Sequence, residues 1–515
     1  MKKPKNLFRI IFGRTMIAVL FLLIQIIVLF VTVTELSAYY EYFYITTLVL
    51  TAVSMVYIIN DNVNTSFKLA WIIPVLTLPV FGTLMYIFVK LELGTRLVNG
   101  RLLKLIEKTK PLIKQNPEVI CRLRREDPAE CNFAEYMNNH AFYPVYENTY
   151  TKYFPLGEDK YKAMLEELEK AEKFIFLEYF IVEEGEMWDT VLELLKRKAA
   201  EGVEVRVMYD GTCTFALLPV NYPKKLAKHG IKCKIFSPIR PVLSTVQNNR
   251  DHRKILVIDG KTAFTGGINL ADEYINAKER FGHWKDTAGM LKGGAVKSCT
   301  ILFLQNWNIY EVKEDDYGSY ICEDFPELAQ LDTDGYVIPY SDSPLDKENV
   351  GENVYIDMLY RAERYVHIMT PYLIIDDDMI TALTYAAKRG VEVCIIMPYK
   401  PDKMYAYLVA RTYYAELISA GVKIYEYTPG FVHAKVFVSD DMRAVVGSIN
   451  LDYRSLFLHF ECAAYTYCTP SVIEAEKDYL ETLKKCTLIT LDDCRKYSIF
   501  KRIAGRILRI IAPLM

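Results

Sequence analysis

One pattern of histidine, lysine and aspartate occurs twice in this chain, and it constrains the fold more than any other feature of the sequence. The first copy is DHRKILVID at residues 251–259, and the second is VHAKVFVSD at residues 432–440. Both follow the spacing HxKxxxxD. Six residues separate each aspartate from the sequence GGIN at 266–269 or GSIN at 447–450. Two copies in one register, each extended by GxIN, predict a duplicated structural unit whose repeated residues have a chemical function.

The segments before each copy also repeat. EKFIFLEYFI near residue 172 is echoed by ERYVHIMTPYLI near residue 363, and KRKAAEGVEVRVM is echoed by YAAKRGVEVCIIM. In the second pair a helix is expected to end at Gly202 or Gly390, with a β-rich run after it. This alternation predicts two α/β modules, each a largely parallel or mixed sheet with helices on its faces. The expected boundaries are 145–315 and 354–491 for the modules and 316–353 for an acidic, turn-rich connector.

Three charge-free apolar segments lie near the N-terminus, at residues 16–34, 43–59 and 69–89. About 20 such residues cross a bilayer as a helix. The first segment is longer than the core of a cleavable signal peptide and no small-residue cleavage site follows it, so we favour retained spans. Residues 1–95 are expected to anchor the chain in the cell membrane by several passes, and residues 96–144 to form a linker.

The flanks of this apolar region decide its orientation. Basic residues lie before the first segment and after the third, so the positive-inside rule places both flanks in the cytoplasm. Three complete crossings do not allow that arrangement. We expect the third segment, which contains Pro74, Pro79 and Gly82, to be broken or re-entrant, and the catalytic part to be cytoplasmic.

The C-terminal residues 492–515 are expected to form a basic amphipathic helix. Its apolar positions recur at helical spacing, at Ile499, Ile503, Ile507, Ile510 and Leu514, opposite Lys501, Arg502, Arg506 and Arg509. Such a helix can lie in an anionic membrane surface. It can equally pack on the preceding domain, and amphipathicity alone does not distinguish the two.

Charge and cysteine content exclude other classes. The 62 basic and 64 acidic residues nearly cancel, which disfavours a nucleic-acid partner. The eleven cysteines are scattered singly, as expected of thiols in a reducing compartment. The HxK spacing with no nearby thiol cluster is a poor zinc site, so we expect no metal and no cofactor.

The repeated residues suit a phosphodiester substrate. If the motif is a strand, His252 and Lys254 share one face, as do His433 and Lys435, while the aspartates lie on the other face and have a structural role. Lysine and asparagine can bind phosphoryl oxygens as charge builds on them, and imidazole can attack phosphorus or move a proton. The residues expected at the phosphate in this way are Asn269, Asn450, Ser448 and Gly267.

Two histidines allow a division of labour, because one can act as the nucleophile while the other is the general acid for the leaving oxygen. Each histidine also needs a group that orients it. A single acid follows each motif among apolar or aromatic residues, Asp286 in FGHWKDTAG and Glu461 in LHFECAAY. We expect these two carboxylates to orient the histidines, although an ordinary ion-paired acid is the alternative.

The stretches HRKILVIDGKTAFTGGIN and HAKVFVSDDMRAVVGSIN resemble the paired HKD motifs of the phospholipase D superfamily. GGINLADEY, FGHWKDT and GSINLDYRSLFLHFE, with the apolar N-terminal region and the basic C-terminal helix, are similar to bacterial cardiolipin synthases from about residue 67 onward. Gly267 stands where the motif usually has serine, whereas Ser448 is kept. The resemblance implies the catalytic set His252, Lys254, Asp259, His433, Lys435 and Asp440.

The resemblance also implies a pseudo-twofold pair of modules with one active site at their interface. The implied reaction is phosphatidyl transfer between two phosphatidylglycerol molecules through a phosphohistidine, which gives cardiolipin and glycerol. His252 would be the nucleophile by superfamily tendency. Another membrane-bound phospholipase or phosphatidyltransferase of the superfamily is the main alternative, and a nuclease or an inactive membrane scaffold are weaker ones.

Overall fold

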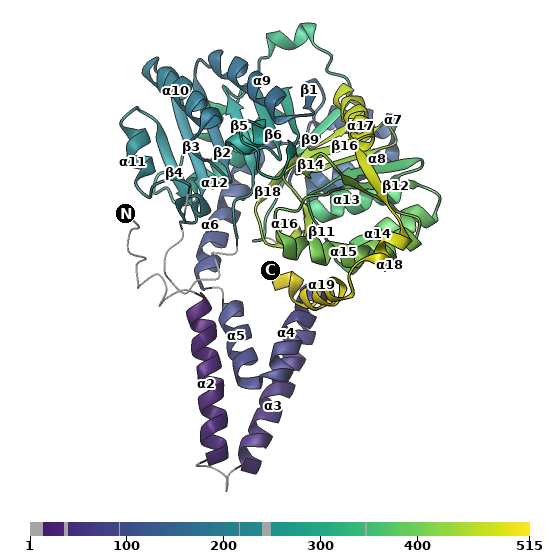
Figure 1. Cartoon of the computed structure of the whole chain (residues 1–515). Coiled ribbons are helices and arrows are strands. Elements are labelled where there is room, and N and C mark those ends of the chain that lie inside the picture. The colour runs from purple at the N-terminus through teal and green to yellow at the C-terminus, as the bar shows by residue number, and fades with distance from the viewer. Residues whose placement is uncertain are drawn as a thin grey trace. The chain divides into compact units, whose positions relative to one another are not determined.

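The computed structural model describes residues 14–34, 40–91, 93–215, 217–238, 249–345 and 348–514 (Figure 1). The chain divides into two compact units. The smaller unit consists of residues 1–97, 239–248 and 506–515, and the larger one of residues 98–238 and 249–505. We describe each unit by itself.

The first sheet of the larger unit has seven strands in the order β1-β8-β6-β5-β2-β3-β4. Its strands are β1 (Thr149–Phe154), β2 (Phe174–Tyr179), β3 (Glu204–Asp210), β4 (Lys232–Phe236), β5 (Lys254–Ile258), β6 (Thr262–Gly266) and β8 (Ala288–Gly293). β2, β3 and β4 run parallel, and the other pairs are antiparallel. The sheet is therefore mixed, as the sequence predicts.

The second sheet repeats this order as β9-β18-β16-β15-β10-β12-β13, with β19 added at the far edge. Its strands are β9 (Tyr336–Asp342), β10 (Tyr365–Met369), β12 (Glu392–Pro398), β13 (Lys423–Tyr427), β15 (Val436–Ser439), β16 (Arg443–Gly447), β18 (Glu461–Tyr467) and β19 (Cys486–Ile489). The expected duplicated fold is confirmed. β9 lies within the segment 316–353 that the sequence suggested as a connector, so this segment contributes a strand to the second sheet.

Helices cover the faces of both sheets (Figure 1). In the first module they are α9 (Gly157–Glu169), α10 (Glu186–Ala200), α11 (Tyr222–Ala227) and α12 (Val296–Asn308), and in the second α13 (Val350–Arg361), α14 (Asp377–Lys388), α15 (Met404–Ser419), α16 (Tyr453–Phe457) and α17 (Pro470–Leu483). Before the first module come α6 (Leu93–Thr109), α7 (Pro117–Glu126) and α8 (Pro128–Asn139). Aromatic stacking joins helix to sheet in both modules, between β2 and α12 in the first and between α13 and β15 in the second. The rings of Phe176 and Phe303 are 4.6 Å apart, and those of Tyr355 and Phe437 are 3.9 Å apart.

The last residue of each motif closes the sheet around it. Asp259 has a positive φ of 54° directly after β5, and its carboxylate accepts backbone N–H groups of Glu172, Lys173 and Phe174 at 2.8 Å. Asp440, with a φ of 58°, accepts the equivalent three N–H groups before β10. Each aspartate thus fixes the start of one strand to the end of its neighbour.

The two modules interlock across their interface. Strand β7 (His283–Lys285) of the first module pairs in parallel with β14 (Gly430–Val432) of the second. The Lys285 ammonium lies 2.6 Å from Asp478, which also accepts the Tyr153 hydroxyl at 2.7 Å. The interface is therefore built from backbone pairing and buried charge.

The smaller unit contains α2 (Arg14–Thr34), α3 (Tyr40–Ile59), α4 (Thr65–Thr77) and α5 (Pro79–Leu91). One helix, Glu41–Ile59, is long and apolar enough to cross a membrane by itself among the described residues. Residues 69–89, the segment expected to be broken or re-entrant, do not form one continuous helix. Helix α4 ends before Leu78, and Pro79 begins α5 at a position where its missing N–H is not needed.

Helices α4 and α5 form a tight hairpin that returns to the end of α3. A Cβ at Gly82 would lie 2.5 Å from the Pro74 carbonyl carbon, so glycine is needed for this close approach. Asp61, just after α3, accepts the Tyr86 hydroxyl at 3.2 Å and forms an ion pair with Lys90 near the end of α5. The hairpin therefore starts and finishes at the same end of α3.

The predicted C-terminal helix is present as α19 (Ile499–Ile511), preceded by α18 (Leu491–Lys496). A Cβ at Gly505 would lie 2.4 Å from the Leu408 carbonyl oxygen, so one face of α19 is in close contact with α15. The opposite apolar face stays open. Phe500 is 81% exposed, Ile503 49% and Ile507 59%.

Candidate active site

Backbone hydrogen bonds bring each motif histidine to the other module. His252 precedes β5, and its N–H donates to the Phe460 carbonyl at 2.9 Å. His433 precedes β15, and its N–H donates to the Lys285 carbonyl at 2.7 Å. Phe460 and Lys285 are the residues directly before the two expected carboxylates. The fold therefore delivers each histidine to a carboxylate of the opposite module.

The side chains of the histidines are also paired with the opposite module. His252 Nδ1 lies 2.9 Å from the Glu461 carboxyl, and His433 Nδ1 lies 2.6 Å from Asp286 Oδ2. All four side chains are buried, with both carboxyl groups fully enclosed. Since Nδ1 is engaged in both rings, Nε2 is the nitrogen left for a substrate.

The two lysines lie beside the rings. Lys254 Nζ donates to the His252 carbonyl at 2.5 Å, and Lys435 Nζ donates to the carbonyl of His433 and lies 2.9 Å from its Nδ1. Each lysine is 1% exposed. Buried ammonium groups at this spacing make the centre strongly positive.

Burial and the neighbouring positive groups together govern the protonation of this centre. Burial, reinforced by Lys435, lowers the pKa of His433 to about 4. Burial and then Lys254 hold the pKa of His252 well below its usual range. Burial also lowers the pKa of Lys254 to about 8 and that of Lys435 to about 7. A bound phosphate anion would reverse these shifts, so the site is suited to an anionic ligand.

The two carboxyl groups differ in protonation. Burial raises the pKa of Glu461 to about 8, although Lys254 and Ser448 oppose it. The pKa of Asp286 is lowered, because Lys435 and His433 together outweigh the opposing effect of burial. At neutral pH His433 therefore faces an ionised carboxylate, whereas the carboxyl group beside His252 is largely protonated.

Gly267 and Ser448 occupy equivalent positions in the two modules, and each lies against a carboxyl group. A Cβ at Gly267 would lie 2.1 Å from Asp286 Oδ1, so the carboxylate fills the space that a side chain would take. In the second module the Ser448 hydroxyl donates to Glu461 Oε2 and accepts the Cys462 N–H at 3.0 Å. Both positions thus support a carboxylate in this structure.

The two motif asparagines are also engaged with the protein. Asn269 donates to the Tyr274 hydroxyl at 2.7 Å and accepts the Ile181 N–H at 3.0 Å. Asn450 donates to the Ser455 hydroxyl at 3.0 Å. Each amide nitrogen keeps a second N–H, which can donate to a phosphate without loss of these bonds. The aspartates of the motif are more distant, since the five residues of β5 separate Asp259 from the histidine end by about 16 Å.

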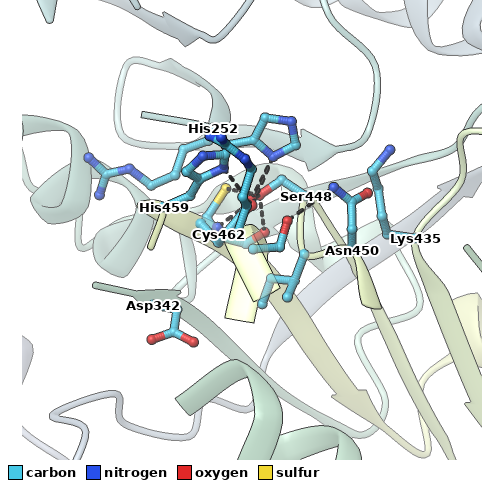
Figure 2. Close-up of polar contacts among 12 residues, drawn as sticks. His252, Asp342, Lys435, Ser448, Asn450, His459 and Cys462 are labelled. Atoms are coloured by element: carbon cyan, nitrogen blue, oxygen red, sulfur yellow. Dashed lines mark hydrogen bonds and ion pairs between the residues drawn. The ribbon is translucent and has the colours of Figure 1, made fainter. Parts of the chain in front are cut away.

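Aromatic side chains and a third histidine complete the walls of the site. Phe180 meets the His252 ring edge to face at 4.9 Å, while Tyr274 and Trp284 lie 5.6 and 5.3 Å from the His433 ring. Figure 2 shows His459 beside His252, and their ring centroids are 5.7 Å apart. His459 belongs to neither HxK motif. Its position two residues before Glu461 was the available signal.

Two groups in the described part of the chain bring potential metal ligands within 4.8 Å of one another: His252, His459 and Glu461, and His367, Glu392 and Cys394. In the first group Nδ1 of His252 is already engaged by Glu461, and two lysines lie close by. Positive neighbours disfavour a divalent cation there and favour an anion.

The chain is similar to known proteins over most of its length. The family model described as "Cardiolipin synthase, PLD-like domain" matches residues 164–280 and 355–483, one segment in each module. A second model, "Phospholipase_D-nuclease N-terminal", matches residues 49–90. A cardiolipin synthase of Geobacillus sp. (strain WCH70) is 38% identical over 373 residues, which cover 72% of this chain and 74% of the relative. This chain belongs to the cardiolipin synthase family. It is a phosphatidyltransferase of the phospholipase D superfamily.

Two further similarities extend over most of the chain. An uncharacterized protein of Streptococcus mutans serotype c is 50% identical over 462 residues, covering 90% of this member of the cardiolipin synthase family and 99% of the relative. The crystal structure of phosphatidylserine synthase from Haemophilus influenzae Rd KW20 superposes with a TM-score of 0.55 at 14% identity. It covers 74% of this chain and 97% of its own length, and it supports the fold.

Proposed function

We propose that this chain joins two phosphatidylglycerol molecules into cardiolipin and releases glycerol. The observation that carries the proposal is that each histidine is held by a carboxyl group of the other module. One oriented imidazole from each module therefore lies at a shared positive centre. One ring can then hold the phosphatidyl group while the other moves the proton. Lys254 and Lys435 would neutralise the charge that develops on the phosphoryl oxygens.

The protonation of the carboxyl groups supports a division of labour between the histidines. A histidine that acts as general acid must start as an imidazolium, and the ionised Asp286, 2.6 Å from His433, stabilises that form. We therefore assign His433 as the acid. In the first step Nε2 of His252 attacks phosphorus, the bond from phosphorus to the glycerol oxygen breaks, and His433 gives its proton to that oxygen.

The second step reverses the proton flow. The terminal hydroxyl of a second phosphatidylglycerol gives its proton to His433 and attacks phosphorus, and the bond from phosphorus to His252 breaks. Phe180, Tyr274 and Trp284 would help to exclude water as a competing acceptor.

We also propose that α2 and α3 cross the cell membrane while α4 and α5 form a re-entrant hairpin. Each hairpin helix has 13 residues, about 20 Å at 1.5 Å per residue, which is too short for a hydrocarbon core of about 30 Å. Two crossings leave both basic flanks on one side, as the positive-inside rule requires for the cytoplasm. A tag inserted between α2 and α3 should be accessible from outside intact cells, and a C-terminal tag should not be. The reverse accessibility would contradict this topology.

The exposed isoleucine face of α19 would lie in the membrane surface. The face is flanked by Lys501, Arg502, Arg506 and Arg509, which suit an anionic lipid surface. This helix would hold the active site near its lipid substrates.

The decisive experiment incubates the purified full chain with phosphatidylglycerol vesicles and separates lipids and released glycerol. Cardiolipin and glycerol should appear in equal amounts, and rapid denaturation at mildly alkaline pH, where a phosphorus–nitrogen bond survives, should trap a phosphatidyl group on the peptide that contains His252. A trapped peptide containing His433 would reverse the two assignments. Phosphatidic acid as the main product would instead indicate a phospholipase, and cleavage of added DNA or RNA a nuclease.

A further inference from the structure

The reaction proposed above brings two phosphates to one site, and the HKD centre accounts for only one of them. The acceptor phosphatidylglycerol carries its own phosphodiester, separated from the attacking oxygen by three carbons and one oxygen. That distance is comparable with the length of one side chain. A site for the second phosphate should therefore lie directly beside His252.

His459 lies at this place. It follows α16, and its N–H donates to the Arg454 carbonyl at 2.8 Å. Its ring centroid is 5.7 Å from that of His252, and its Nδ1 is 4.0 Å from Glu461 Oε1. Neither ring nitrogen has a hydrogen-bond partner among the described residues, although both atoms are buried. A buried imidazole without hydrogen-bond partners destabilises the folded protein unless a ligand forms hydrogen bonds with it.

The surroundings of His459 are cationic. The backbone of the same segment is held by Arg250, whose carbonyl accepts the Phe460 N–H at 2.8 Å, and by the turn that carries Arg454. Burial and then Arg454, Lys254, Arg250 and Lys403 hold the pKa of His459 well below its usual range, so the ring is neutral and can donate from one nitrogen. Arg454 itself is exposed and within reach of a lipid headgroup. These charges fit an anion and oppose a metal ion.

We propose that His459 and Arg454 bind the phosphodiester of the acceptor phosphatidylglycerol. This subsite would orient the terminal hydroxyl of the acceptor toward the phosphatidyl group held by His252. It would also favour an acceptor that carries a phosphate over glycerol or water. The inference rests on the proposed function and adds the part of the site that selects the acceptor.

The test compares two acceptors on the same donor. Transfer to phosphatidylglycerol gives cardiolipin, whereas exchange of radiolabelled glycerol into phosphatidylglycerol uses an acceptor without phosphate. Arg454→Gln and His459→Gln should each lower cardiolipin formation by about 10- to 100-fold, the loss expected for one charge-assisted hydrogen bond. Glycerol exchange should fall at least about tenfold less than cardiolipin formation in each variant, since it does not use the subsite.

Matched controls are Arg495→Gln and His229→Gln, which change the same residue types outside the site and should leave both reactions unaltered. An equal fall in both reactions, or no fall in either, would overturn the subsite. If the unmodified protein transfers to neither acceptor, the proposed function itself is wrong, and this outcome is distinct from the other two. Thermal midpoints of the variants confirm that each is folded.

Discussion

Replacing Asp286 by asparagine tests the assignment of His433 as general acid. The amide keeps the size of the side chain but cannot stabilise an imidazolium 2.6 Å away. Loss of general acid–base assistance typically costs about 10²- to 10⁴-fold in rate, which is about 3 to 5 kcal/mol of transition-state stabilisation. We therefore expect Asp286→Asn to form cardiolipin from phosphatidylglycerol about a thousandfold more slowly than the unmodified protein.

The assay uses two donors that differ only in the leaving group. Glycerol leaves as a poor anion and needs a proton from His433, whereas p-nitrophenol leaves without one. With a phosphatidyl p-nitrophenol donor, release of the nitrophenol in a single turnover should fall by less than about tenfold in Asp286→Asn, because the step no longer needs the acid. A thousandfold loss on both donors would refute the assignment of Asp286 and His433 to proton transfer.

Glu461→Gln is the matched control in the other module. The pKa of Glu461 is raised to about 8 by burial, so the active, ionised form that accepts the His252 Nδ1–H increases as pH rises through about 8. The rate of the unmodified protein should rise over this range. In Glu461→Gln the rise should be absent, and the loss relative to the unmodified protein should be about tenfold smaller at pH 7 than well above pH 8, since only about a tenth of the carboxyl is ionised at pH 7. A larger loss at pH 7 than in Asp286→Asn would indicate that His252 is the acid.

Three further predictions concern other parts of the chain. Gly267→Ser should lower the rate about 100-fold without unfolding the protein, measured by cardiolipin formation and thermal midpoint, because its Cβ would displace Asp286 from His433. Asp259→Asn should lower the free energy of unfolding by about 1–3 kcal/mol in denaturant titrations, since the amide cannot accept all three N–H groups, while the folded fraction keeps its rate. Ile503→Asp with Ile507→Asp should weaken binding of the detergent-purified protein to anionic vesicles, and unchanged binding would contradict a membrane role for α19.

The internal repeat allowed the fold to be predicted from the sequence. The paired HxKxxxxD motifs and the helix-glycine-strand echoes at Gly202 and Gly390 predicted two related α/β modules, and both sheets have the same strand order. The place of β9 in the second sheet was harder to foresee. β9 belongs to the second sheet although it lies in a turn-rich segment, because pairing with β18 is a long-range contact that local composition does not encode.

The site could be predicted only in part from the sequence. The candidate residues His252, His433, Asp286 and Glu461 could be chosen from their types and spacing, but their pairing across the modules could not, since it depends on the β7–β14 contact and on the bond from His252 to Phe460. The role of Gly267 was likewise hidden. Its missing side chain is explained by the position of Asp286, which only the folded chain reveals.

The pairing of each histidine with a carboxyl group of the other module also has a consequence while the protein is being synthesised. The ribosome completes the first module before Glu461 and His433 exist, so the nascent half, already beside the bilayer, holds a histidine without its orienting acid. A truncated or half-made product should therefore leave surrounding phospholipids intact. Lipid chemistry can begin only once the polypeptide is finished and its halves have closed on each other.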